Sequence, residues 1–324
     1  MDNVDGKQAR RTGTSSPLGE LFDHGIDSLN CTLASLLETA AMGFGPTKTG
    51  AFTALVPCLP MFFSTWETYH THTLYLGYFN GPTEGLILAC SFMIISGIYG
   101  PGVWSLPIAS YLPIVKPYLS AKTSINDIWV WILLGTFLVA HLPTCIINVV
   151  RARRAQNLPL APVFKEWTPM VVYTAGCMAW LGSPHSSLLT KNHLLLFCLT
   201  MSLVFGRMTT KIILAHLTRQ PFPYWTVMLV PLLGGAALVN APPMLGFKPV
   251  GEQLEVLYLR AYFVFAAIVY TRWAVLVINS ICAFLGINCL TIPHQKAETV
   301  KEGEKRDRSM EGEKINGGFG EKKD

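Results

Sequence analysis

About eight stretches of roughly 20 mostly apolar residues dominate this sequence, and each is long enough to cross the ~30 Å hydrocarbon core of a bilayer as a helix. They begin near Leu18, Gly50, Pro82, Asp127, Trp167, Asn192, Phe222 and Leu254. Only 14% of the 324 residues are charged, whereas soluble globular proteins carry about 25%. We therefore predict an all-α polytopic membrane protein, a bundle of about eight transmembrane helices.

The positions of Lys and Arg predict the orientation of this bundle. Strict alternation of the spans places Arg10, Arg151 to Arg154, Arg207 to Arg219 and the basic C-terminal tail on the same side. Cytosolic loops of membrane proteins are enriched in Lys and Arg. The N-terminus and the tail are therefore predicted to be cytosolic.

The pattern predicts one transmembrane domain over residues 1–292. Residues 293–324 alternate Lys, Arg, Glu and Asp and contain one aromatic residue, Phe319. Such a composition cannot bury enough apolar surface to fold, so we expect a disordered, charged cytosolic tail. Eight cysteines are dispersed through the apolar segments with no close pair, and we interpret them as buried thiols rather than disulfides or zinc ligands.

Before and inside the first apolar stretch, the sequence reads D-x2-D-G-x2-A-R-x8-G-x3-D-x3-D. The eight positions of this motif are Asp2, Asp5, Gly6, Ala9, Arg10, Gly19, Asp23 and Asp27. Spacings of three and four residues place side chains on one face of a helix, so two helices could bring four carboxylates together. Such a group near a membrane calls for one or two divalent cations, and oxygen ligands favour Mg2+ or Mn2+.

The other motif positions favour a phosphate-bearing nucleotide. Gly6, Ala9 and Gly19 have little or no side chain, which allows close approach of a ligand, and Arg10 supplies a cation for phosphate. A simpler interpretation is that Asp23 and Asp27 only cap the first helix and that the basic residues are an ordinary cytosolic flank.

All eight positions match the signature of the CDP-alcohol phosphatidyltransferase family, which this chain resembles. The surrounding sequences, from Asp5 to Thr12 and from Ser16 to Gly25, resemble more narrowly the eukaryotic choline and ethanolamine phosphotransferases. The segment from Ser64 to His72 resembles fungal members. The resemblance implies a ten-helix fold that lacks roughly its first two helices here, because relatives carry about two spans before the motif. We therefore expect an N-terminally truncated chain.

The resemblance also implies an activity. Phosphocholine or phosphoethanolamine would pass from CDP-choline or CDP-ethanolamine to diacylglycerol, with release of CMP. By the family pattern, Asp2, Asp5, Asp23 and Asp27 bind the metal, most simply as two Mg2+ or Mn2+ ions. Four further positions would bind the CDP moiety, namely Gly6, Ala9, Arg10 and Gly19. The expected setting is the membrane of the endoplasmic reticulum or Golgi, as a homodimer with its active site facing the cytosol and no nucleic acid partner.

The diacylglycerol hydroxyl needs a proton acceptor, and His24 lies directly beside Asp23 with a pKa near neutrality in its unperturbed form. We expect Glu84, at the start of the third apolar stretch, to orient it. Asp27 is an alternative base. Glu67 with His70 or His72 is a second alternative pair, because Glu67 and His70 share a helix face.

Three aromatic residues, Trp66, Tyr69 and Tyr75, invite two interpretations. They could form a cation–π surface for a quaternary ammonium group, but aromatic residues at a membrane boundary more often form an interfacial belt. An alternative function for the whole chain is a catalytically impaired membrane isoform that acts as a dimer partner. A transporter is disfavoured because no inverted repeat is visible.

Overall fold

The computed structural model describes residues 2–72, 85–111, 114, 118, 120 and 122–290, without the side chains of residues 2–5 and 86. Its contacts form two compact units. The smaller unit comprises Met1–Asp23 and Thr271–Asp324, and the larger unit comprises His24–Tyr270. The expected tail lies outside the described residues.

Helices make up about 76% of the described chain, which contains no β-strand and a single isolated bridge between Pro107 and Ser124. The α-helices are α1 (Asp2–Arg11), α2 (Pro17–Ala41), α3 (Lys48–Leu55), α4 (Cys58–Thr71), α5 (Leu86–Tyr99), α6 (Ile125–Thr136), α7 (Leu142–Ala155), α8 (Thr168–Leu181), α9 (Leu194–Leu217), α10 (Leu229–Met244) and α11 (Glu252–Leu285). The prediction of an all-α membrane protein is confirmed.

Each predicted apolar stretch coincides with a helix or with two consecutive helices. In chain order these are α2, α3 with α4, α5, α6 with α7, α8, α9, α10 and α11. One boundary differs from the prediction, because α10 begins at Leu229 and not near Phe222. Pro221 and Pro223 explain the delay, since proline lacks the N–H of a helix interior and disfavours helical backbone in the residue before it.

Two of the stretches are interrupted within their length. Val56 and Pro57 separate α3 from α4, and Pro57 marks the break because its ring conflicts with a continuous helix. A single π-helical turn, Phe137–His141, joins α6 to α7. The turn brings His141 Nε2 to 3.1 Å from the carbonyl oxygen of Pro60 and 3.3 Å from Ser64 Oγ. Through this turn, the side chain of His141 contacts α4.

The N-terminal part of the smaller unit is a helix–turn–helix. α1 ends at Arg11 and is followed by Gly13, whose φ of 63° is left-handed, and the Thr14 N–H donates to the carbonyl of Ala9 at 2.9 Å. This arrangement is a glycine C-cap. Ser16 then accepts the Gly19 N–H on its hydroxyl at 3.2 Å, with Pro17 as the first helical residue. Ser at the N-cap and Pro at the first position are the preferred start of a helix.

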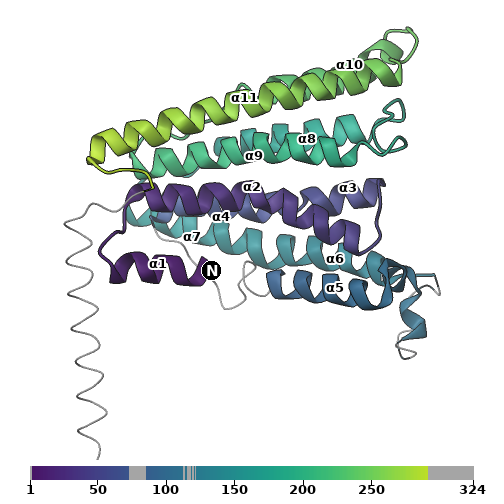
Figure 1. The fold of residues 1–324 in the computed structure, drawn as a ribbon, viewed down its shortest axis with the longest axis horizontal. Coiled ribbons are helices and arrows are strands. Elements are labelled where there is room, and N and C mark those ends of the chain that lie inside the picture. Colours follow the sequence, from purple (N-terminus) through teal and green to yellow (C-terminus); the bar gives the residue numbers. More distant parts are fainter. Residues whose placement is uncertain are drawn as a thin grey trace, which may run out of the picture. The chain divides into compact units, whose positions relative to one another are not determined.

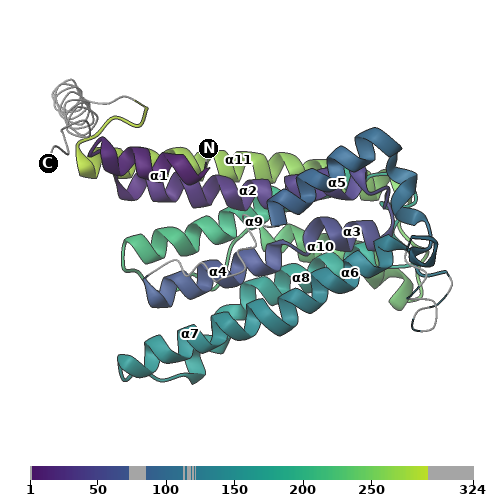
Figure 2. The same cartoon turned by 90° about the horizontal axis from the view of Figure 1, so that it is seen from below.

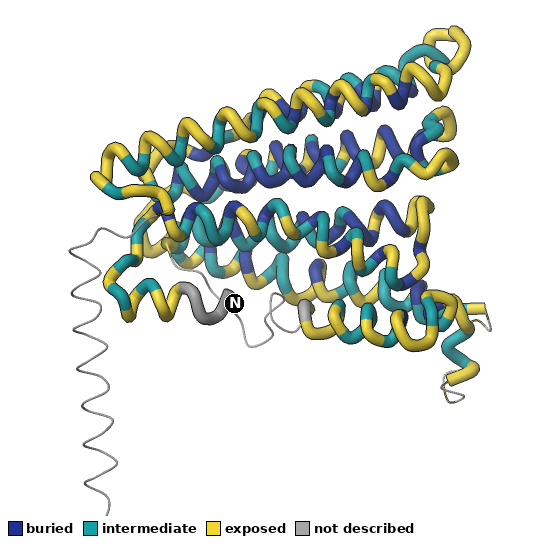
Figure 3. The backbone as a smooth tube through the Cα atoms, in the orientation of Figure 1, coloured by how far each residue is buried: buried dark blue, intermediate teal, exposed yellow. Residues whose placement is uncertain are grey.

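In the larger unit, α4 packs against both α7 and α9, and α8 packs against α10. Figures 1 and 2 show these helices running roughly along one direction. In the most apolar 18-residue stretch of α9, 72% of the residues are buried, whereas only 11% are buried in the corresponding stretch of Ile125–Ala155, which contains α6 and α7. Figure 3 shows the same contrast between these helices. α9 is therefore a central helix of this unit, whereas α6 and α7 present apolar side chains outward, as helices do toward lipid.

Three described segments are long and apolar enough to cross a membrane, Ile125–Ala155, Leu194–Leu217 and Glu252–Leu285. Two shorter apolar helices are Ile87–Tyr99 and Leu229–Met244. Aromatic side chains fill much of the core of the larger unit, including Trp66, Tyr173, Trp180, Phe197 and Phe205.

All eight cysteines are free thiols, as expected. Four of them are buried, Cys58, Cys145, Cys177 and Cys198. The expectation of burial is wrong for Cys90 and Cys289, which are exposed. Cys90 lies on an outward face of α5, and Cys289 follows the end of α11, so neither position faces the core.

Candidate active site

One turn of α2 gathers three residues of the predicted site. The carboxylates of Asp23 and Asp27 and the imidazole of His24 each offer a ligand atom, and these atoms all lie within 4.8 Å of one another. All three residues are half-buried. The spacing follows from the helix, because positions i and i+4 are neighbours on its surface. Two carboxylates in this arrangement fit a hard divalent cation such as Mg2+ or Mn2+.

Small residues hold the part of α2 in the larger unit close to α9. A Cβ atom added to Gly25 would lie 3.5 Å from the side chain of Thr210, and one added to Gly206 would lie 2.6 Å from Leu29. Ser202 Oγ also donates a hydrogen bond to the Leu29 carbonyl at 2.7 Å. Gly and Ser permit such close approach of membrane helices. The contact fixes which face of α2 is covered and which face Asp27 occupies.

The first part of the motif lies on α1. Asp2 and Asp5 belong to this helix, but their side chains lie outside the described residues. The predicted convergence of four carboxylates therefore stays a prediction. Gly6 and Arg10 are exposed, and a Cβ atom at Gly6 would lie 3.7 Å from Nη1 of Arg10. Ala9 is half-buried.

Gly19 stands at the start of α2 with open space beside it. A Cβ atom there would have Ser16 Oγ as its nearest neighbour, at 3.9 Å. The Gly19 N–H donates a hydrogen bond to the hydroxyl of Ser16, which caps the helix. The exposed start of a capped helix is a place where N–H groups and the helix dipole favour an anion. This position is compatible with the expected contact to a nucleotide phosphate.

The expected partner of His24, Glu84, lies outside the described residues. The structure does place the backbone of His24, whose carbonyl accepts a hydrogen bond from Ser28 Oγ at 2.7 Å. This contact lies within α2 and keeps the helix regular through the histidine. The assignment of His24 and Glu84 as the catalytic pair remains a prediction.

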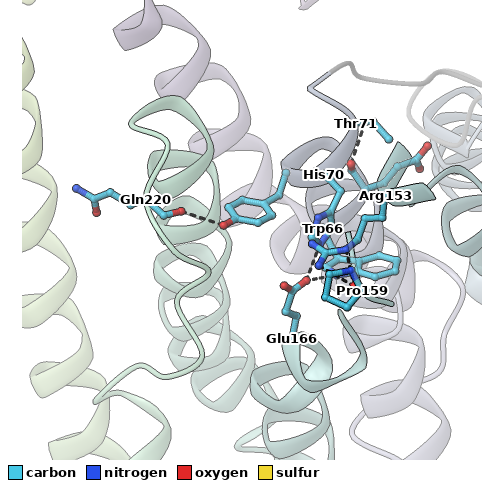
Figure 4. Close-up of polar contacts among 9 residues, drawn as sticks. Trp66, His70, Thr71, Arg153, Pro159, Glu166 and Gln220 are labelled. Atoms are coloured by element: carbon cyan, nitrogen blue, oxygen red, sulfur yellow. Dashed lines mark hydrogen bonds and ion pairs between the residues drawn. The ribbon is translucent and has the colours of Figure 1, made fainter. Parts of the chain in front are cut away.

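The alternative pair of Glu67 and His70 is not formed. His70 Nε2 lies 2.6 Å from Oε2 of Glu166, and Glu67 Oε1 accepts from Asn148 Nδ2 at 2.7 Å. Figure 4 shows His70 and Trp66 both directed at the Glu166 carboxylate. Glu67 and His70 share a helix face but do not pair with each other. His70 instead contacts Glu166, which lies between α7 and α8, and Glu67 contacts Asn148 of α7.

One aromatic residue of α4, Trp66, differs from both interpretations of the sequence. Trp66 is 1% exposed, and its Nε1–H donates to Glu166 at 2.8 Å. It is therefore a core residue, neither part of an interfacial belt nor a surface for a cation. The hydroxyl of Tyr69 donates to the carbonyl of Gln220 at 2.9 Å. Tyr75 lies outside the described residues.

Sequence reasoning missed Glu166 and the second buried glutamate, Glu255. Glu166 lies in η6 (Ala161–Trp167), a short 3-10 turn that connects α7 to α8. Both glutamates are nearly inaccessible, at 5% and 1% exposure. Burying a carboxylate within or beside an apolar segment costs free energy unless hydrogen bonds or an ion pair compensate it. A glutamate in such a segment could therefore have been predicted to have a buried partner.

Comparisons with known proteins identify relatives of this chain. No family model matches the chain. The chain is 31% identical over 314 residues to the uncharacterized CDP-alcohol phosphatidyltransferase class-I family protein 3 of Dictyostelium discoideum, covering 90% of this chain and 75% of that protein. It is 35% identical over 312 residues to choline/ethanolaminephosphotransferase 1 of Arabidopsis thaliana, covering 92% and 76%. It is 36% identical over 307 residues to choline/ethanolaminephosphotransferase 2 of the same plant, again covering 92% and 76%.

Proposed function

The chain belongs to the CDP-alcohol phosphatidyltransferase family, and from this premise we propose that it transfers phosphocholine or phosphoethanolamine from its CDP ester to diacylglycerol. The hydroxyl oxygen of diacylglycerol forms a bond to the β-phosphorus of the CDP ester. The bond between that phosphorus and the bridging oxygen of CMP breaks, and the hydroxyl gives up its proton. The products are phosphatidylcholine or phosphatidylethanolamine, and CMP.

The proposal depends most on the group formed by Asp23, His24 and Asp27, whose ligand atoms lie within 4.8 Å of one another. We assign Asp23 and Asp27, together with Asp2 and Asp5, to Mg2+ or Mn2+. A bound divalent cation would neutralise charge on the pyrophosphate and stabilise the leaving CMP. Imidazole is a poorer ligand than carboxylate for these hard ions. His24 is therefore better suited to proton transfer beside the metal than to binding it.

The remaining motif residues serve the nucleotide in this proposal. Arg10 is exposed on α1 and offers a planar, permanently charged guanidinium, which suits phosphate oxygens. Gly6 and Ala9 leave room on the same helix. Gly19 leaves open space where α2 begins. These residues bind and orient the CDP ester, so that its β-phosphorus is presented to the incoming hydroxyl.

His24 accepts the proton of the diacylglycerol hydroxyl in this proposal. A base with a pKa near the working pH is effective in such transfers. Glu84 would hold the imidazole in the correct orientation and stabilise its charged form. Asp27 is the alternative acceptor, because it lies on the same turn of α2.

The chain is a multi-pass membrane protein. We propose the endoplasmic reticulum or Golgi as its location, with the motif on the cytosolic side, because the clusters of Lys and Arg alternate with the spans as the positive-inside rule requires. We also propose that it acts as a homodimer.

The test is CMP release by the purified chain in diacylglycerol-containing micelles, with Mg2+ and either CDP-choline or CDP-ethanolamine. Asp23→Asn is expected to reduce turnover at least ~100-fold, because it removes a charge from the metal site. Glu20→Gln is the matched control, since it changes a carboxylate one turn earlier on α2 outside the motif.

Turnover that survives Asp23→Asn would contradict the proposed site. Tight binding of CDP-choline without turnover of the unchanged chain would contradict the proposed activity, and would favour a catalytically impaired dimer partner. The choice of headgroup follows from which CDP ester gives the faster metal-dependent release of CMP.

A further inference from the structure

A cavity of about 350 Å³ opens among the C-terminal ends of α4, α7 and α9. Its volume lies within the range of small-molecule sites. The described residues that line it all belong to the larger unit, and none of them is part of the motif between Asp2 and Asp27. The ionisable and aromatic side chains that line it are Tyr69, His70, His72, Arg153, His216 and Arg219.

The lining of this cavity is basic. Two arginines and three histidines face it, and none of the described side chains that line it is a carboxylate. Glu166, which accepts hydrogen bonds from His70 and Trp66, is not among the lining residues. Among the described lining residues, the two arginines give the cavity a positive charge, which attracts an anion.

Two of the histidines in the lining lie directly against each other. The Nδ1 atoms of His72 and His216 lie 3.2 Å apart, with the rings stacked at an angle of 25°. With both rings neutral, one Nδ1 can donate to the other. The ring that accepts this hydrogen bond carries its proton on Nε2, and that N–H can donate to an anion beside the pair.

The other walls are held in place by hydrogen bonds. Arg153 donates from Nε and Nη2 to the carbonyl of Pro159, at 3.0 and 2.8 Å. This uses two of the five N–H donors of a guanidinium and fixes its plane (Figure 4). The hydroxyl of Tyr69 is held by the carbonyl of Gln220, and His70 is held by Glu166. Side chains that are already fixed lose little entropy when they bind a ligand.

Basic residues at the cytosolic ends of spans are common for reasons of topology alone. Such a flank needs neither a cavity nor fixed side chains. Here α4, α7 and α9 bring their ends together around one space, and hydrogen bonds position Tyr69 of α4 and Arg153 of α7. This geometry indicates a binding site rather than a flank.

We propose that this cavity binds a phosphate group, with Arg153 and Arg219 supplying permanent charge and the adjacent pair of His72 and His216 supplying a ring N–H donor. Arginine and phosphate match in both charge and geometry. The phosphate belongs either to a soluble metabolite or to the headgroup of an anionic lipid in the same membrane. Both sources present the same chemistry to the cavity, and a single experiment separates them.

The experiment measures how fast diethyl pyrocarbonate modifies individual histidines of the full chain in nanodiscs, at constant pH and ionic strength, by mass spectrometry. One arm adds inorganic phosphate to discs of phosphatidylcholine, with chloride as the ionic-strength control. A second arm replaces part of the phosphatidylcholine with phosphatidic acid. His185 is the internal control, because it is exposed and lies away from the cavity lining.

Phosphate is expected to slow the modification of His72 and His216 but not of His185. Arg219→Gln should weaken this protection about tenfold, since it removes a charge-assisted hydrogen bond. The matched variant Arg151→Gln removes an exposed arginine of α7 outside the lining and should leave protection unchanged.

Protection by phosphatidic acid in the discs, at phosphate concentrations that give none, would identify a lipid headgroup as the ligand. Protection by soluble phosphate alone would identify a metabolite. The proposal is wrong if neither arm protects both histidines, if chloride protects them equally, or if Arg151→Gln weakens protection as much as Arg219→Gln.

Discussion

His70 and Glu166 form a buried pair, with Nε2 of the histidine 2.6 Å from Oε2 of the glutamate and side chains that are 5% and 6% exposed. Trp66 donates its indole N–H to the same oxygen. The pair ties α4 to the turn before α8, and in doing so it fixes one wall of the basic cavity. Because the carboxylate receives two ring N–H groups, its replacement leaves donors buried without an acceptor.

Glu166→Ala is therefore expected to lower the free energy of unfolding by about 2–4 kcal/mol, because the ring N–H groups of Trp66 and His70 both lose their buried acceptor. Unfolding in mixed micelles with increasing SDS measures the change. Glu67→Gln is the control, since its amide oxygen can still accept from Asn148 and a change below about 1 kcal/mol is expected. Equal losses in the two variants would contradict the importance of the buried pair.

Glu255→Ala is expected to be more damaging. The carboxylate of Glu255 accepts from Trp180 Nε1, from Ser186 Oγ, and from both the N–H and the hydroxyl of Ser187. Removing it should cost at least about 3 kcal/mol, because several buried donors lose their acceptor.

Glu252→Ala provides the comparison on the same helix. Glu252 pairs with Lys191 at 3.2 Å, but both side chains are about half exposed. Exposed pairs of this kind contribute about 0–1 kcal/mol. The same SDS titration would contradict the argument if Glu252→Ala proved as destabilising as Glu255→Ala.

Gly206→Ala is expected to push α2 away from α9. The added methyl carbon would lie 2.6 Å from Leu29 Cδ2 and 3.0 Å from Leu29 Cγ, so either the side chain or the helix must move. Overpacking of this kind costs about 1–3 kcal/mol. A shift of α2 would also misplace Asp27 and lower the rate of CMP release.

Gly97→Ala is the matched change in α5, where a Cβ atom would meet nothing within 4 Å. Alanine is favoured over glycine in a helix by about 1 kcal/mol, so this variant should be neutral or slightly more stable, with unchanged turnover. Loss of activity in Gly97→Ala would show that helix α5 itself, and not the approach of α2 to α9, limits the reaction.

His24→Gln separates the two roles open to a histidine beside two carboxylates. As a base, its loss should reduce kcat by about 10²–10⁴ and leave Mn2+ binding unchanged. As a ligand, its loss should weaken Mn2+ binding, which electron paramagnetic resonance of the free ion measures without turnover. Asp27→Asn is the comparison, and it is expected to weaken Mn2+ binding because it removes a carboxylate from the metal site.

The helices could be located from the sequence because the length and apolarity of a span are local properties. All eight stretches became helices, and the spacing of Asp23 and Asp27 sufficed to place both carboxylates on one turn of α2. The same reasoning placed the motif glycines, since Gly19 is exposed where a helix begins.

The partners of the buried polar residues could not be located in this way. His70 was paired by helix spacing with Glu67, yet it binds Glu166, which is 96 residues away in the sequence. Helix packing inside a bundle brings together residues that are far apart in the sequence, so their separation along the chain does not predict which of them will be in contact. Glu166 lies in a short turn without a periodic pattern, so only the packing of α4 beside it determines the contact.

The π-helical turn between α6 and α7 has a consequence for how this segment tolerates changes in length. Such a turn holds one residue more than an α-helix needs. Deleting a single residue between Phe137 and His141 would remove the extra residue and restore α-helical register up to Pro143, which has no backbone N–H to donate in either case. Each residue turns a helix by about 100°, so the whole of α7 would face another direction relative to α6. Asn148 would leave Glu67 and Arg153 would leave the cavity, while the hydropathy of the span stayed the same.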